Sequence, residues 1–343
     1  MSGDPLAALK ASRAQAFNLS TNIGRTRLRA LLEKADRELS QRLHQSDWLR
    51  GSGKDTFTAT QMRVTLAQIR AVTANVTHGM AKLMGQQAED ASSHAVSSLV
   101  DYLQRAEKAF SGVASQPLPL REAAMLSKVG QGVNSSLLRR LASSGEPLAG
   151  ADEEPHPAKL GILQRYGVDT IDHFEDSLQQ SVVQRKTWAE TRGDMVEQSP
   201  FLQGAPAHWA ERVVRTETMG AYNRAGWETI READQALGDM CKILAATFDD
   251  RTGWDSYQVH GQIRRPEEPF AWADGLYQHP PNRPNDRETV VPHRIAWVIP
   301  PYLKPKSDGE VAARYKMERK TGSPGPRPMM TTIPLNSFGK SPK

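Results

Sequence analysis

Apolar residues along positions 58–110 recur at alternating steps of four and three, the spacing that lines one narrow face of a helix. The first half of this face consists of Met62, Leu66, Ile69, Thr73, Val76, Met80 and Leu83. After Met84 the face continues, shifted as in a coiled-coil stutter, through Ala88, Ala91, Ala95, Leu99, Tyr102 and Ala106. About 50 helical residues, each rising 1.5 Å, span roughly 75 Å. The pattern therefore predicts one long helix that packs against other helices.

A second helix is predicted for the preceding residues, 6–49. One face of it is apolar at intervals of three and four, with Leu28, Leu31, Leu32, Ala35, Leu39 and Leu43. Gly51-Ser52-Gly53 then ends the pattern. We expect the two helices to form an antiparallel hairpin whose apolar seam grips another protein, and we also consider an oligomer formed through these N-terminal helices.

Prolines and glycines divide the rest of the chain. Pro117 and Pro119 interrupt the helical pattern, and a third helix is predicted over 120–143. The acidic, Pro/Gly-rich residues 146–158 are interpreted as a linker. The predicted organisation is therefore an elongated helical region (1–145), this linker, a compact domain (159–300) and a tail (301–343).

The hydrophobic pattern of the compact domain changes from helical to strand-like along its length. Helical spacing predicts helices over 168–192 and 208–237, followed by a short strand over 243–248 that runs into a turn. Residues 266–284 are expected to form an ordered loop and a short hairpin, and 295–299 the last strand. The predicted fold class is mainly α with a small α+β domain: an elongated N-terminal helical hairpin or coiled coil followed by a compact C-terminal domain.

The tail is basic, with nine Lys/Arg against three Asp/Glu after Pro301. Because it also contains several prolines and glycines, we expect much of it to be disordered. Its basic residues could contact DNA phosphates or an acidic protein, the candidates being Lys304, Lys306, Arg314, Lys316, Arg319 and Lys320. A solvated tail without a partner is the alternative.

Composition narrows the class of protein. Only 6% of the 343 residues are aromatic, which favours a helical protein over a large β-sandwich. The net charge of +5 is too small to demonstrate nucleic-acid binding. The single cysteine, Cys241, is interpreted as a buried apolar side chain. The sequence has neither a secretory leader nor an apolar run of the ~18 residues needed to span a membrane, so we expect synthesis in a cytoplasm.

Gly51-Ser52-Gly53-Lys54 has the end of a phosphate-binding loop but not the rest of it. Trp48 stands where the motif needs glycine, and Asp55 stands where it needs serine or threonine. We interpret these residues as a turn between helices. The chain also lacks a Gly-x-Ser-x-Gly elbow, so no nucleophile is assigned.

Two further groups of residues carry candidate chemistry. A divalent metal is one alternative for the polar residues of the compact domain, namely Asp249, Asp250, His260, His279 and His293. Their spacing gives no sign of convergence, so we expect loop side chains bonded to the backbone and no metal site. Glu217 could act as an acid or base, but an ion pair with Arg215 or Arg251, or a solvated position, is favoured.

Residues 170–295 resemble the phage Mu protein F-like family of head-morphogenesis (minor capsid) proteins. The resemblance lies in an ordered series: a helix like 174–182, an Arg-Thr-Glu with a downstream Asn, an Asp-x-Arg-Thr turn after a strand, a His-Gly and a later glycine. The matching residues are Arg215, Thr216, Glu217, Asn223, Asp249, Arg251, Thr252, His260, Gly261 and Gly275. Where family members often have Cys-Arg-Cys, this chain has Pro292-His293-Arg294, so no cysteine-based linkage carries over.

The resemblance implies a minor structural protein of a phage head that joins procapsid assembly near the portal and takes part in DNA packaging or ejection. The implied partners are the portal protein and the major capsid or scaffolding protein, with packaged double-stranded DNA as a second partner. The motif residues would act as an internal brace, with no catalytic residue, metal or cofactor and no membrane. The expected location is the head interior, after assembly in the host cytoplasm. The alternatives are a toxin-like or transferase-type enzyme domain and a nonspecific DNA-binding protein.

Overall fold

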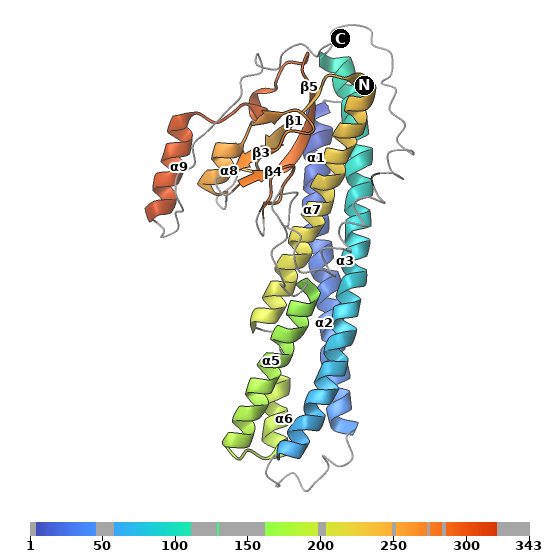
Figure 1. The fold of residues 1–343 in the computed structure, drawn as a ribbon, viewed down its shortest axis with the longest axis vertical. Coiled ribbons are helices and arrows are strands. Elements are labelled where there is room, and N and C mark those ends of the chain that lie inside the picture. Colours follow the sequence, from blue (N-terminus) through green and yellow to red (C-terminus); the bar gives the residue numbers. More distant parts are fainter. Residues whose placement is uncertain are drawn as a thin grey trace.

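A long shaft of helices carries a small group of strands and short helices beside one end (Figure 1). The computed structural model describes residues 5–45, 58–110, 129, 162–197, 204–248, 252–272, 275–282 and 286–320. The described residues are mainly helical with a few antiparallel strands. The predicted fold class, mainly α with a small α+β part and a long N-terminal helical hairpin, is confirmed.

The first arm of the helical hairpin is one continuous helical rod made of three segments: α1 (Pro5–Asn18), the π-helical turn η1 (Leu19–Ile23) and α2 (Gly24–Gln45). Asn18 and Gly24 both have right-handed helical dihedrals, so the rod continues through η1 without a break. The hydroxyls of Ser20 and Thr21 both donate to the carbonyl of Phe17. Such side-chain bonds compete with the backbone ladder and accompany the local widening.

Helix α3 (Ala59–Phe110) follows the rod back in the opposite direction (Figure 1). A capping box begins it, because the Thr58 hydroxyl accepts from the Gln61 amide while the Gln61 side chain accepts from the Thr58 amide. The predicted apolar face is buried on both sides of the shift after Met84; Ile69, Met80, Ala95 and Tyr102 all have exposed fractions of 0%.

The same chain covers the apolar seam of α3, which corrects our expectation that this seam grips another protein. Helices α5 (Ile162–Val183) and α7 (Gly204–Leu237) pack along α3 on the sides that the rod leaves open (Figure 1). One hydrophobic core runs from Ala16 in the rod to Leu303 near the C-terminal end. The two predicted parts, 1–145 and 159–300, thus share a core, while the predicted linker 146–158 lies outside the described residues.

The helix predicted over 168–192 is in fact two helices. Helix α5 ends at Val183, Arg185 has a positive φ of 53°, and α6 (Trp188–Glu197) begins after Thr187. Thr187 and Glu190 form a capping box across the start of α6, with both the hydroxyl and the amide of Thr187 donating to the Glu190 carboxylate. This Thr-x-x-Glu signal outweighs the apolar periodicity that continues through the turn.

Two small antiparallel sheets lie beside the upper half of α7 (Figure 1). The larger sheet has the strand order β2-β1-β5, and its strands are β1 (Met240–Ala245), β2 (Ile263–Arg264) and β5 (Thr289–Arg294). The predicted hairpin within 266–284 is present as β3 (Phe270–Trp272) paired with β4 (Gly275–Tyr277). The short helix α8 (Trp254–Val259) connects β1 to β2.

The last strand differs from the prediction. We expected it at 295–299, but the pairing with β1 ends at Arg294, and β5 contains Pro292 opposite Lys242. Because β5 is the edge of the sheet, its proline can direct the side that lacks an N–H away from β1. Proline made this strand difficult to recognise in the sequence.

Part of the predicted disordered tail is ordered. A 3-10 turn (Pro301–Leu303) and helix α9 (Asp308–Lys320) follow the sheet. Helix α9 opens with a capping box between Ser307 and Glu310. It packs on α8, where the Tyr315 ring meets the Trp254 ring edge-on, and its Val311 is buried. Residues 321–343 lie outside the described part, as do Gly51–Lys54. The same holds for the helix predicted over 120–143, apart from the buried, helical Val129.

The buried seam yields a stability prediction. Ile69→Ala should lower the free energy of unfolding by about 2–5 kcal/mol, because it leaves a cavity between tightly packed helices. The matched control is Arg70→Ala, at the next position of α3, where the side chain is exposed. Denaturant unfolding followed by circular dichroism measures both, and equal stability of the two variants would contradict the burial of the seam.

Candidate functional site

Four residues of the predicted motif, Arg215, Thr216, Glu217 and Asn223, lie on α7. Glu211 accepts from Arg215, one turn later on α7, at 3.1 Å and from Arg25 of α2 at 3.2 Å. Arg215 therefore joins an ion-pair group that connects α7 to the rod. Thr216 donates to the Arg212 carbonyl within the helix, and Glu217 is buried with an exposed fraction of 2%.

Asn223 clasps the start of β5. Its side-chain amide donates to the Glu288 carbonyl at 3.0 Å, and its side-chain carbonyl accepts from the Val290 amide at 3.1 Å. One buried side chain thus satisfies two backbone groups that are 65 and 67 residues away in sequence. The clasp holds the edge strand of the sheet against α7.

His260 and Gly261 tie the end of β1 to the segment before α9. His260 Nδ1 accepts from the Ala246 amide, so Nε2 carries the proton that it donates to the Tyr302 carbonyl. Gly261 has a φ of +79°, and an added Cβ would lie 2.5 Å from the backbone nitrogen of Pro305. Only glycine fits this crossing, where its amide also donates to the Leu244 carbonyl.

The remaining motif residues are only partly described. Thr252 donates its hydroxyl to the Thr247 carbonyl, two residues after the end of β1. Gly275, with a φ of +155°, is the first residue of β4. Asp249 and Arg251 lie outside the described residues, so the ion pair considered between Glu217 and Arg251 is untested.

The three candidate metal-binding histidines each contact backbone carbonyls. His260 contacts Tyr302, His279 Nδ1 lies 2.9 Å from the Pro280 oxygen, and His293 Nε2 lies 3.3 Å from the Trp297 oxygen. No three His, Cys, Asp or Glu side chains converge into a metal-binding group within the described part of the chain. These contacts are those of the backbone-bonded alternative. Burial lowers the pKa of both His260 and His293 to about 4.

Lys242 was missed by the sequence analysis, although a lysine inside the apolar run of β1 was a visible signal. Its side chain is fully buried, and Nζ donates to the backbone oxygen and to Oε1 of Gln278 at 2.9 and 2.8 Å. The rings of Phe270 and Trp227 lie 4.9 and 5.8 Å from Nζ. Burial lowers the pKa of Lys242 to about 7. The neighbouring Cys241 is buried as expected, and burial raises the pKa of its thiol to about 12.

A second group that the sequence analysis missed fastens the sheet to the C-terminal end of α3. Arg294 donates through Nη1 to Glu107 at 2.6 Å and through Nε to Asp239 at 2.9 Å. Trp297 Nε1 donates to the same Glu107 oxygen at 3.2 Å. The charge-assisted bond between Arg294 and Glu107 joins residues 187 apart in sequence, so the pattern within either segment could not reveal it.

The basic residues of the tail divide into two groups. Lys306 pairs with Glu310 at 3.2 Å and lies over the Phe248 ring, and Arg314 lies over the Tyr257 ring. Lys304 and Lys316 are exposed. Helix α9 extends through Arg319 and Lys320, whose side chains are not among those described.

Comparison of the chain with protein-family models, curated proteins and solved structures finds no match in any of the three. None of the described helices combines the length and the apolar character that crossing a membrane requires. The candidate site is therefore defined by its own geometry. It is a set of buried hydrogen bonds and ion pairs that hold the sheet on the shaft.

The clasp predicts a large effect from one amide. Asn223→Ala should lower the free energy of unfolding by about 2–4 kcal/mol, because two buried backbone groups of β5 lose their partner. Asn22→Ala is the matched control, since Asn22 is bonded to Asn18 at an exposed position of the rod. Thermal and denaturant unfolding measure both, and a loss at Asn223 no larger than at Asn22 would refute the clasp.

The buried histidines predict a loss of stability in acid. A histidine titrates near 6.5 in an unfolded chain and near 4 at position 293 of the folded chain. Below pH 6.5 the unfolded state therefore binds the additional proton, and stability present above that pH is lost as pH falls toward 4. Between pH 6.5 and 4.5, His293→Gln should lose about 2 kcal/mol less than the unsubstituted protein.

Unfolding titrations at several pH values test this difference. The exposed His78 of α3, replaced in the same way, is the matched control. Parallel pH profiles for His293→Gln and the unsubstituted protein would show that His293 is not held neutral by the fold.

Proposed function

We propose that this chain is a minor structural protein of a phage head, which joins procapsid assembly near the portal and takes part in DNA packaging or ejection. The proposal combines the resemblance to the Mu protein F-like family with one observation. The described motif residues, including Asn223, His260 and Gly261, are engaged in holding β1 and β5 in place. A motif used in this way favours a rigid assembly component over an enzyme.

The shape of the molecule supports the same proposal. Helix α3 alone has 52 residues, and at 1.5 Å per residue it spans roughly 78 Å. The two sheets with α8 and α9 form a knob beside one end of the shaft (Figure 1). A shaft of that length with a braced knob can bridge two components of an assembly. The Arg294–Glu107 contact and the Asn223 clasp keep the knob from rotating on the shaft.

The docking surface for the portal, capsid or scaffolding protein must lie outside the α3 seam. The seam is already filled by the rod, α5 and α7. The outer faces of the shaft carry exposed charges, some of them in ion pairs such as Arg27–Asp90. Polar surfaces of this kind suit reversible contacts during assembly more than a permanent apolar interface.

Packaged double-stranded DNA is the proposed second partner. Lys304 and Lys316 are exposed near and on α9, where they can neutralise phosphates by displacing counterions. Lys306 and Arg314 are already engaged with Glu310 and with aromatic rings, so few basic side chains are left for DNA and the contact is weak. Because phosphates are the same at every base pair, the contact does not depend on the DNA sequence. The proposed location is the interior of the head, with assembly in the host cytoplasm.

Quantitative mass spectrometry of purified particles tests the proposal. We expect a small, constant number of copies per particle, protected from added protease by the closed shell. In a parallel measurement, duplex-DNA binding by the purified protein should weaken with salt, and Lys304→Gln with Lys316→Gln should reduce the slope by about 2. A protein absent from particles that turns over a small molecule would contradict the proposal.

A further inference from the structure

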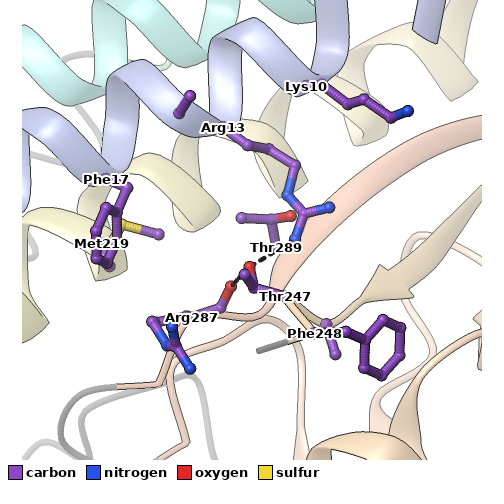
Figure 2. Close-up of a pocket in the computed structure, with 10 residues that line it drawn as sticks. Lys10, Arg13, Phe17, Met219, Thr247, Phe248, Arg287 and Thr289 are labelled. Atoms are coloured by element: carbon purple, nitrogen blue, oxygen red, sulfur yellow. Dashed lines mark hydrogen bonds between the residues drawn. The ribbon is translucent and has the colours of Figure 1, made fainter. Parts of the chain in front are cut away.

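A cavity of about 510 Å³ lies between α1, α7 and the ends of β1 and β5 (Figure 2). Most of its described lining comes from α1, with Lys10, Arg13 and Phe17, and from the residues beside the ends of β1 and β5, with Thr247, Phe248 and Arg287, while α7 adds Met219. The volume is within the ~300–1,000 Å³ typical of small-molecule sites. None of these residues belongs to the motif or to the proposed DNA contact.

The charge of the described lining is one-sided. Lys10, Arg13 and Arg287 contribute to it, and none of the described lining residues is acidic. Glu288 is close enough to act on the charge of Arg13, but one of its carboxylate oxygens accepts from the Arg287 amide and its side chain is buried. The cavity therefore presents positive charge to whatever occupies it.

Arg13 is held in position before any ligand binds. Its Nη2 group donates to the Ala245 carbonyl at 3.2 Å and to the Thr247 hydroxyl at 3.0 Å, and Figure 2 shows it reaching from α1 across to Thr247. Its hydrogen bonds to described residues use Nη2 alone, so within the described part of the chain Nε and Nη1 are left as donors. Burial lowers the pKa of Arg13 because it disfavours the charged guanidinium, and a bound anion would offset that desolvation.

Apolar side chains flank Arg13. Phe17 and Met219 lie together on one side of Arg13, and Phe248 lies on the other (Figure 2). Phe248 is 37% exposed, although the rings of Tyr257 and His260 pack against it at steep angles and Lys306 Nζ lies 4.6 Å from its ring centroid. The part of this side chain that stays exposed offers an apolar surface for the body of a ligand.

We infer that this cavity binds a small organic anion, with its carboxylate or phosphate head against Arg13, in the positive field of Lys10 and Arg287, and its apolar body against Phe17, Met219 and Phe248. The inference is independent of a role in head assembly. A charged head without an apolar body would leave the aromatic side unfilled. An apolar molecule without a charge would leave the Arg13 donors unpaired.

Isothermal titration calorimetry at low salt tests the inference with three probes: 2-naphthoate, its neutral analogue 2-naphthamide, and adenosine monophosphate. We expect at least one anion to bind about tenfold or more tightly than the amide. Tighter binding of the naphthoate supports a carboxylate head, and tighter binding of the nucleotide supports a phosphate head. Binding of neither anion, or equal binding of the amide, would overturn the inference.

Two substitutions locate the binding. Arg13→Gln and Lys10→Gln should each weaken the preferred anion by about tenfold, whereas Arg29→Gln, at an exposed ion pair of α2, should leave binding unchanged. Because Arg13 also bonds to the sheet, thermal unfolding checks that its variant folds, and Lys10, which is exposed, provides the second reading. Unchanged affinity in Lys10→Gln and in a folded Arg13→Gln would place the anion elsewhere.

Discussion

Burial of the apolar face of α3 by helices of the same chain is the contact on which the rest of the structure depends. A helix of 52 residues with an apolar stripe along its length cannot remain unpartnered in water. The rod of α1 and α2 covers part of the stripe, and α5 and α7 cover the remainder. Because α7 also supports the sheet, covering the stripe determines where the knob is located.

Buried polar contacts hold the sheets on the shaft in addition to the apolar core that the two parts share. The larger sheet has only three strands, and one of them, β5, is an edge that contains proline. Asn223, His260 and Arg294 each connect this sheet to a segment distant in sequence. Such bonds are costly to break, because each leaves a buried group without a partner. This explains how residues that look catalytic in a sequence can serve as supports.

Periodicity predicted the helices well because each helix repeats one signal over many residues. The two long helices of the hairpin and their antiparallel pairing were recognisable from spacing alone. What periodicity could not supply was the identity of the covering helices, so the seam of α3 was interpreted as a surface for another protein. Capping-box residues mark the helix start after Arg185 (Thr187 and Glu190) and the start of α9 (Ser307 and Glu310). These short local signals carried less weight in the prediction than the apolar periodicity. The partners of Asn223 and Arg294 lie too far along the chain for any local pattern to indicate.

Hydrogen exchange along α3 tests the central claim most directly, because it reports whether the chain covers its own seam. Amides from Ile69 to Leu99 should exchange only through global unfolding, at rates that are the same at protein concentrations about tenfold apart. Rapid exchange in the dilute protein, with protection that appears only as concentration rises, would show that another molecule covers the seam and would contradict this account.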